Sequence, residues 1–206
     1  MMDGGWVFLD IDTQVDFMLP HGALYVPGAE QIIPNLRALM VYAQEHQIPV
    51  LSSADAHAPD DPSFAQWPPH CVVGTEGQRR IPETQLSPSL VIPNRLGAFT
   101  PPLQPVAQVI VEKVDYDISS NPNFDAVLSA LAPRRFVVFG VATEYCVQAS
   151  VLALLRRGFE AALVTDAVRA ITEEGSRKAL DLLYARGVRS IQTSDIVAGS
   201  ALIRGI

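Results

Sequence analysis

The stretch Phe136-Val-Val-Phe-Gly-Val-Ala-Thr-Glu-Tyr-Cys-Val-Gln-Ala-Ser150 joins two sequence patterns. Its apolar, β-branched run predicts a buried strand up to Gly140, and the spacing from Thr143 to Leu155 predicts a helix. Cys146 therefore falls in the first turn of a helix that follows a strand. Free backbone N–H groups and the positive end of the helix dipole both favour a thiolate at such a place. The segment alone indicates either a nucleophilic cysteine or a small buried residue.

The same alternation of strand and helix patterns runs along the chain. Apolar runs predict strands at Trp6–Ile11, Ile48–Ser53, Val106–Glu112, Arg135–Gly140, Glu160–Thr165 and Val188–Thr193. Helical spacing predicts helices at Glu30–His46, Pro122–Leu131, Glu144–Arg157 and Glu173–Arg186. Candidate caps and helix-ending glycines are Asn121, Thr143, Thr172, Gly158 and Gly187. We therefore expect a three-layer α/β/α fold, in which helices cover both faces of a mostly parallel, six-stranded sheet.

Length and composition narrow the class of protein. The 206 residues suit one domain, 1-206, and a hydrophobic fraction of 49% supplies a sizeable core. A net charge of -7 gives no electrostatic footprint for nucleic acid or an anionic membrane. Two cysteines are too few for a disulfide framework. Met1–Trp6 lacks a signal-peptide pattern, and no apolar run of about 18 residues could span a membrane. We expect a cytoplasmic protein without nucleic-acid or membrane partners.

The segment 54-105 differs from the rest of the chain. It contains most of the prolines and shows little periodicity. A loop of this length in a compact domain is more often functional than a simple linker. The chain has no G-x-x-x-x-G-K and no G-x-G-x-x-G motif, which counts against a nucleotide cofactor. We expect this segment to contribute metal and substrate contacts.

Polar side chains follow several of the predicted strands, and parallel strands bring such residues to one edge of the sheet. The first strand leads to Asp10, Asp12 and Asp16, the third to Lys113 and the fourth to Cys146. We take Asp12 as the base for Cys146, because a partly dry cleft raises the pKa of a carboxylate towards that task. Lys113 can stabilise both the carboxylate and the thiolate. Asp10 or Asp16 as the acid, and purely structural roles for Asp12 and Lys113, are the alternatives.

A possible metal site follows the second predicted strand. Asp55 and His57 form a D-x-H pair, and His70 stands in Trp67-Pro-Pro-His-Cys71. One carboxylate and two imidazoles suit one divalent metal ion, namely zinc, iron or manganese. Taken alone the pattern is weak, and solvated loop residues are the alternative. Cys71 is expected to be a small buried residue.

Together these motifs resemble those of the nicotinamidase branch of the isochorismatase-like cysteine hydrolases. The similarity runs from about Trp6 to Thr193, nearly the whole chain. The segments that carry it are Asp12-Thr-Gln-Val-Asp-Phe17, Asp55-Ala-His57, Trp67-Pro-Pro-His-Cys-Val-Val-Gly-Thr75, Glu112-Lys113 and Gly140-Val-Ala-Thr-Glu-Tyr-Cys146. The last of these and the tryptophan-containing motif are the specific ones.

The resemblance implies a role for each matching residue. The implied catalytic triad is Asp12, Lys113 and Cys146, and the implied metal ligands are Asp55, His57 and His70. The implied oxyanion hole consists of the N–H groups of Ala142 and Cys146, next to a cis peptide between Val141 and Ala142. The implied substrate-binding residues are Phe17 and Trp67, which would sandwich an aromatic ring, with Tyr145 or Tyr116 as a further wall. Homo-oligomers are common in the family, so we expect one here.

The activity that the resemblance implies is metal-assisted hydrolysis of nicotinamide to nicotinate and ammonia through a thioester. Many relatives carry a further metal-binding histidine shortly after D-x-H, but the segment Ala58–Phe64 has none. Either three protein ligands suffice, or Asp61 or Ser63 substitutes through water, or metal binding is weaker. The alternatives are a related amide or ureido (N-carbamoyl) hydrolase, an isochorismatase-type hydrolase and, last, a non-catalytic scaffold.

Overall fold

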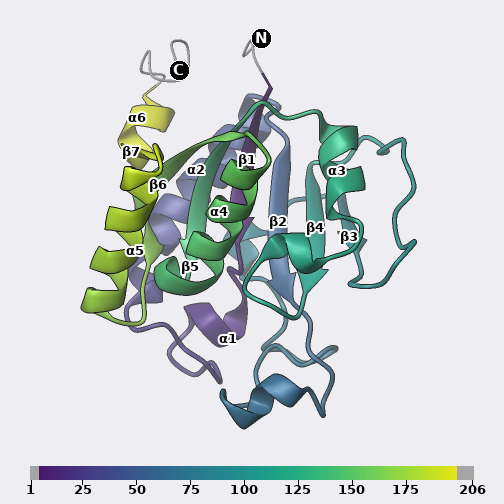
Figure 1. Ribbon diagram of the computed structural model, residues 1–206, viewed down its shortest axis with the longest axis vertical. Helices are drawn as coiled ribbons and strands as arrows, with labels where there is room; N and C mark the ends of the chain where they lie inside the picture. Colours follow the sequence, from purple (N-terminus) through teal and green to yellow (C-terminus); the bar gives the residue numbers. More distant parts are fainter. Residues whose placement is uncertain (1–4, 199–206) are drawn as a thin grey trace.

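The computed structural model describes residues 5–198, and every pairing between its strands is parallel (Figure 1). The strands are β1 (Trp6–Ile11), β2 (Val50–Asp55), β3 (Ser89–Ile92), β4 (Gln108–Lys113), β5 (Arg135–Val141), β6 (Glu160–Arg169) and β7 (Arg189–Ile191). Their order across the sheet is β3-β4-β2-β1-β5-β6-β7. Because parallel neighbours need crossover connections, helices come to lie on both faces of the sheet. The expected α/β class is confirmed.

The helices form two layers, one on each face of the sheet (Figure 1). They are α1 (Val15–Met18), α2 (Ile33–Glu45), α3 (Phe124–Leu131), α4 (Gln148–Arg156), α5 (Glu173–Ala185) and α6 (Thr193–Val197). Apolar side chains of α1, α2 and α6 belong to one core cluster, and those of α3, α4 and α5 belong to another. The sheet separates the two clusters, which gives the predicted three layers.

The central strand β1 shows why a buried strand is apolar at nearly every position. Trp6 and Phe8 pack in the core on the α2 side, whereas Val7, Leu9 and Ile11 pack on the α4 side. Successive side chains of a strand point to opposite faces, and here both faces are covered. A continuous apolar run, rather than an alternating one, is therefore the pattern of a strand in the middle layer.

The predicted number of six strands is wrong by one. The additional strand, β3, lies inside the segment 54-105, where no strand was expected. It spans only four residues, between Pro88 and Pro93, and pairs in parallel with β4. So short a run carries no measurable periodicity, and the flanking prolines read as loop signals.

Several predicted boundaries also differ from the structure. The helix expected from Glu144 begins as a π-helical turn, Thr143–Val147, and becomes α-helical only in α4. The helix expected from Glu30 begins as a 3₁₀ turn before α2. The strand expected to reach Thr193 ends at Ile191, because Thr193 already begins α6.

The predicted helix ends have mixed outcomes. Thr172 caps α5, since its Oγ1 accepts a hydrogen bond from the backbone N–H three residues later at 3.0 Å. Gly158 and Gly187 adopt positive φ angles of 82° and 87° directly after α4 and α5, as expected. The predicted caps at Asn121 and Thr143 are wrong, because α3 begins later and the Thr143 hydroxyl has no hydrogen-bond partner within residues 5–198.

The two ends of the expected domain, residues 1–4 and 199–206, lie outside the described residues. Most of Met1–Trp6, the stretch expected to lack a signal peptide, is among them. Within residues 5–198, no helix combines the length and the apolar character needed to cross a membrane.

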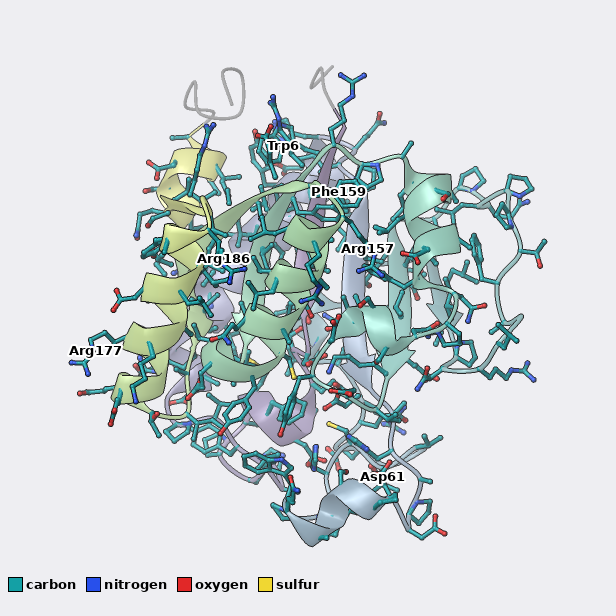
Figure 2. The ribbon with its side chains drawn as sticks, viewed as in Figure 1. Trp6, Asp61, Arg157, Phe159, Arg177 and Arg186 are labelled. Carbon is teal, nitrogen blue, oxygen red and sulfur yellow. The ribbon has the colours of Figure 1, made fainter. Side chains whose placement is uncertain are left out.

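The segment between β2 and β3 lies beyond the carboxyl ends of the strands (Figure 1). Trp6 at the start of β1 and Asp61 in this segment mark opposite ends of the molecule (Figure 2). Buried side chains that follow β1 hold the segment in place. Gln14 Nε2 donates to the Asp55 and Gln78 carbonyls, both at 2.8 Å, and Asp16 Oδ2 accepts from the Cys71 N–H at 2.7 Å.

A buried ion pair provides another attachment of this segment. The Arg80 guanidinium contacts the Asp10 carboxylate, and both side chains are almost completely buried. Arg80 also donates from Nη1 to the Ser53 carbonyl at 3.0 Å and from Nη2 to Thr13 Oγ1 at 2.6 Å. Burial lowers the pKa of Arg80 to about 9, so the guanidinium is still charged at neutral pH. The pair therefore fastens the segment to the end of β1.

Replacing Arg80 with leucine should lower the free energy of unfolding by about 3–5 kcal/mol, because Asp10 would become a buried, unpaired charge. Urea denaturation of both proteins measures the difference. Lys178→Ala is the matched control, since the Lys178–Glu174 pair is exposed and should contribute at most about 0.5 kcal/mol. Equal losses in the two variants would contradict the structural role of Arg80.

Candidate active site

Cys146 lies in the π-helical turn that follows β5. Just before this turn, the backbone of β5 lies very close to that of its neighbour β1. Gly140 has a φ of 118°, and a Cβ at this position would lie 2.1 Å from the Ile11 carbonyl oxygen. Only glycine allows β5 to pass β1 so closely there. The peptide between Val141 and Ala142 is cis, as the resemblance implied. The sequence G-V-A thus carries the chain from the sheet into the turn with the cysteine.

The Lys113 ammonium, at the end of β4, is the meeting point of the site. Its Nζ lies 2.8 Å from Asp12 Oδ2 and 3.4 Å from Cys146 Sγ, and it also contacts Asp55 Oδ1. All four residues are buried. The structure therefore brings together the residues that the sequence placed at the ends of β1, β2, β4 and β5.

Burial and charge have opposing effects on these groups. Burial alone would lower the pKa of Lys113, but Asp12 and Asp55 outweigh it and hold that pKa well above its ordinary value. Burial raises the pKa of the Cys146 thiol well above its ordinary value, despite the nearby Lys113. Burial also raises the pKa of Asp12, although Lys113 opposes this. Without substrate, the site thus holds a protonated thiol beside a carboxylate of increased basicity.

Ser53 holds Asp12 in position. Its Oγ donates to Asp12 Oδ1 at 2.6 Å and accepts from the Asp12 N–H at 3.2 Å. Asp12 has a φ of 49°, a left-handed conformation that is unusual for a residue with a side chain. The two hydrogen bonds offset part of the cost of that conformation and aim the carboxylate at Lys113.

The other two candidate acids have different partners. Asp10 is paired with Arg80. The Asp16 oxygens accept from the backbone N–H groups of Ala23, at 2.9 Å, and of Cys71. Among the described residues, neither carboxylate forms a hydrogen bond or ion pair with Lys113. Of the three candidate acids, Asp12 is therefore the one that shares Lys113 with the cysteine.

Asp55, His57 and His70 converge at the other side of Lys113. Asp55 Oδ2 lies 3.6 Å from His57 Nε2 and 3.8 Å from His70 Nε2. Two ligands bound to one zinc ion at tetrahedral angles lie roughly 3.4 Å apart. His70 Nδ1 lies 2.8 Å from the Pro68 carbonyl, a contact that leaves Nε2 as the free nitrogen. The spacing and chemistry of these donors fit one divalent metal ion.

Asp61 and Ser63, the expected substitutes for a further ligand, lie beside this group. Asp61 Oδ2 is 3.0 Å from His57 Nδ1, the ring nitrogen opposite to the one that faces Asp55. Asp61 Oδ1 accepts from the Ser63 N–H at 2.9 Å. Asp61 therefore contacts a candidate metal ligand rather than the position between the ligands.

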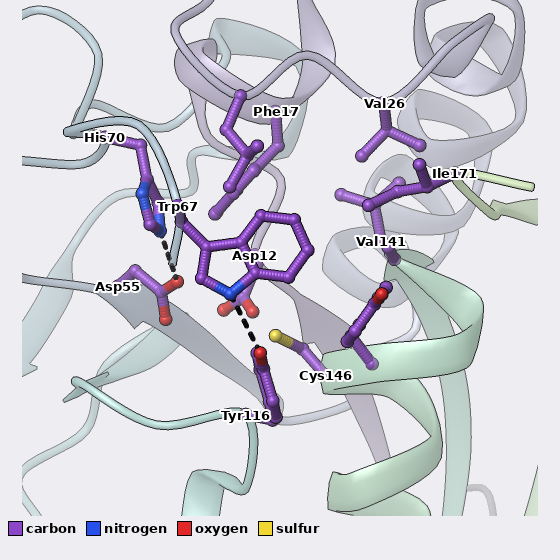
Figure 3. Close-up of a pocket in the computed structure, with 13 residues that line it drawn as sticks. Asp12, Phe17, Val26, Asp55, Trp67, His70, Tyr116, Val141, Cys146 and Ile171 are labelled. Atoms are coloured by element: carbon purple, nitrogen blue, oxygen red, sulfur yellow. Dashed lines mark hydrogen bonds and ion pairs between the residues drawn. The ribbon is translucent and has the colours of Figure 1, made fainter. Parts of the chain in front are cut away.

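A partly enclosed cavity opens beside Cys146 (Figure 3). Its lining residues are Asp12, Phe17, Leu24, Val26, Asp55, Trp67, His70, Tyr116, Val141, Ala142, Tyr145, Cys146 and Ile171. Figure 3 shows Asp55 and His70 on one side of Trp67 and the apolar Val26 and Ile171 on the other. This lining suits a small molecule with one polar and one apolar end.

Aromatic side chains form much of the cavity wall. Trp67 Nε1 donates to the Tyr116 hydroxyl at 2.9 Å, and the Trp67 and Tyr145 rings meet edge to face with centroids 5.4 Å apart. The Phe17 ring lies 5.5 Å from the His70 ring. All four expected wall residues, Phe17, Trp67, Tyr116 and Tyr145, thus line one cavity. Such flat walls favour a planar ring as ligand.

Sequence patterns did not reveal the roles of several residues that shape the site. The Glu144 carboxylate accepts from the backbone N–H groups of Ile171 and Thr172, both at 3.0 Å, and so fixes the loop after β6 that lines the cavity. Gln14 also accepts from the Asp55 N–H at 2.8 Å. Polar residues that bind distant backbone carry no spacing signal, and the apolar wall residue Val26 looks like any core residue.

Comparison with known proteins finds the family described as "Isochorismatase domain" over residues 7–195. A nicotinamidase of Escherichia coli (strain K12) is 27% identical over 78% of this chain and 81% of its own. A nicotinamidase of Acinetobacter baylyi is 26% identical over 91% of this chain and 92% of its own. The crystal structure of a Pyrococcus horikoshii pyrazinamidase in complex with zinc is 29% identical, with a TM-score of 0.78 over 91% of this chain and 99% of its own.

The alkylation rate of Cys146 by iodoacetamide should rise about tenfold per pH unit through the neutral range. The reason is that burial raises the pKa of this thiol, so the reactive thiolate fraction grows with pH below that pKa. Mass spectrometry of the labelled protein separates Cys146 from the buried Cys71. A fast rate at Cys146 that does not change between about pH 6 and about pH 8 would instead indicate a preformed thiolate.

Proposed function

Because this chain belongs to the isochorismatase family and is a nicotinamidase-like hydrolase, we propose that it hydrolyses nicotinamide to nicotinate and ammonia. The observation that carries the proposal is the Lys113 ammonium, which joins Asp12 and Cys146 to an aspartate-histidine-histidine group. A thiol, a base and a metal-binding group around one small cavity suit hydrolysis of an aromatic amide. The names of the two curated relatives support this choice of amide.

The proposed metal ligands are Asp55, His57 and His70. When bound there, a divalent ion would supply a Lewis-acidic position for the pyridine nitrogen of the substrate. Phe17 and Trp67 would flank the ring and leave its carboxamide near Cys146. Zinc, iron and manganese all accept this set of ligands.

In the proposed acylation step, Asp12 takes the proton of the Cys146 thiol. A carboxylate oxygen of Asp12 and Sγ of Cys146 lie within 4.8 Å of each other, and Lys113 stabilises the thiolate that forms. Sγ attacks the carboxamide carbon, and the N–H groups of Ala142 and Cys146 bind the resulting oxyanion. The C–N bond then breaks while Asp12 returns its proton to the leaving nitrogen. The products of this step are ammonia and a thioester on Cys146.

In the proposed deacylation step, Asp12 acts as a base for a second time. It takes a proton from a water molecule, whose oxygen attacks the thioester carbon. The C–S bond breaks, Asp12 passes its proton to Sγ, and the product leaves as a carboxylic acid that ionises in water. One water is consumed for each amide bond, and both Asp12 and Cys146 return to their starting states.

Purified protein should release ammonia from nicotinamide, lose this activity after chelation and regain it when zinc, iron or manganese is added. Each arm is followed by an ammonia assay on the same preparation. No ammonia from a folded, metal-loaded protein would rule out nicotinamide as the substrate. Pyrazinamide, ureido compounds and isochorismate would then be the next substrates to assay.

Cys146→Ala should abolish the hydrolysis, because no thioester could form, while the far-ultraviolet circular dichroism stays unchanged. We expect a loss of at least about a thousandfold in kcat, the scale seen when a nucleophile is removed. Cys71→Ala is the matched control, since Cys71 is buried, does not line the cavity and should affect stability more than kcat. Hydrolysis retained by Cys146→Ala would disprove the covalent route.

A further inference from the structure

Asp61 is placed to act on the metal site without binding the metal. It lies in the segment beyond the sheet, at the lower end of the molecule in Figure 2. Its Oδ2 lies 3.0 Å from His57 Nδ1, while His57 Nε2 faces Asp55. The imidazole therefore has a carboxylate against each of its two nitrogens.

The two ring nitrogens of a neutral imidazole have different functions. One carries a proton and donates a hydrogen bond, and only the other can bind a metal ion. A carboxylate close to Nδ1 favours the proton at that nitrogen and so leaves Nε2 unprotonated. At His57 the Asp61 oxygen is the nearer one, at 3.0 Å from Nδ1, whereas the Asp55 oxygen lies 3.6 Å from Nε2. Asp55 is also paired with Lys113. His70 also has an acceptor at Nδ1, where the Pro68 carbonyl forms a hydrogen bond at 2.8 Å. The Asp61 carboxylate meets His57 Nδ1 as an ion-pair contact instead.

We propose that Asp61 is a positioning residue that holds His57 in the tautomer whose Nε2 can bind the metal. The inference rests on the metal site of the proposed function. The carboxylate thus supports a ligand that is already present instead of adding one.

The carboxylate of Asp61 has two tasks that an amide cannot perform together. Its Oδ1 accepts from the Ser63 N–H at 2.9 Å and caps the 3₁₀ turn Pro62–Ala65, while Oδ2 faces His57. An asparagine has one acceptor oxygen and one NH₂ group. Its oxygen can therefore accept a hydrogen bond from either the Ser63 N–H or the Nδ1–H of His57, but not from both. The NH₂ group, which is a donor, would then face the remaining N–H.

Asp61→Asn is the decisive variant and Asp60→Asn its matched control. Asp60 is the exposed neighbour in the same segment, and both changes remove one negative charge. Zinc alone is the probe, and its dissociation constant is measured by competition with a chromogenic chelator. Asp61→Asn should weaken zinc binding by about 10- to 100-fold, whereas Asp60→Asn should stay within about twofold of the unchanged protein.

A second measurement on the metal-free protein reads the tautomer directly. The ring ¹⁵N shifts of His57 should indicate a proton on Nδ1 in the unchanged protein and in Asp60→Asn. In Asp61→Asn they should move towards a proton on Nε2. Circular dichroism and thermal unfolding of each variant show whether the fold is retained.

The outcomes separate this inference from the proposed activity. Suppose that zinc binding depends on Asp61 as expected, but the protein releases no ammonia from nicotinamide. Nicotinamide would then be ruled out as the substrate, and the inference about Asp61 would stand. Equal zinc affinities in folded Asp61→Asn and Asp60→Asn, or unchanged ¹⁵N shifts in Asp61→Asn, would overturn the inference. An unchanged protein that does not bind zinc would overturn it together with the metal site.

Discussion

The buried ammonium of Lys113 is the constraint on which the rest of the site depends. Asp12 and Asp55 end neighbouring strands of the sheet, so their carboxylates are forced close together away from water. Two like charges in such a place would drive one carboxylate to take up a proton. Lys113, at the end of the next strand, contacts both and keeps the pKa of Asp55 well below its ordinary value, although burial opposes this. The order of the strands therefore brings the two carboxylates together and also supplies the ammonium that balances their charge.

Asp55 links the two halves of the site through its two oxygens. Oδ1 contacts Lys113, and Oδ2 faces the imidazoles of His57 and His70. Its backbone is fixed as well, because Gln14 binds both its N–H and its carbonyl. A shift of this single residue would move the carboxylate that faces the imidazoles and the charge beside the thiol together. These two hydrogen bonds to the Asp55 backbone give a structural role to Gln14, the buried glutamine between Asp12 and Asp16.

Local patterns in the sequence were enough to predict the parallel sheet and to predict that Asp12, Lys113 and Cys146 meet at one edge of it. Buried strands are long apolar runs, and parallel strands bring their ends to one edge, so no distance information was needed. The short strand β3 was missed because four residues carry too little pattern. Ser53 and Glu144 were missed because their partners lie far along the chain, and only the folded protein shows the pairing.

The two outermost strands of the sheet, β3 and β7, have only four and three residues, fewer than any other described strand. Pro88 directly precedes β3 and Pro93 directly follows it, and a proline has no backbone N–H that could pair with another strand. An exposed edge strand is a template on which a strand of another molecule can add, and short edges with nearby prolines remove that template. The long, apolar strands that could seed such aggregation are enclosed in the middle of the sheet. The order of the strands thus leaves only short strands at the two edges of the described sheet.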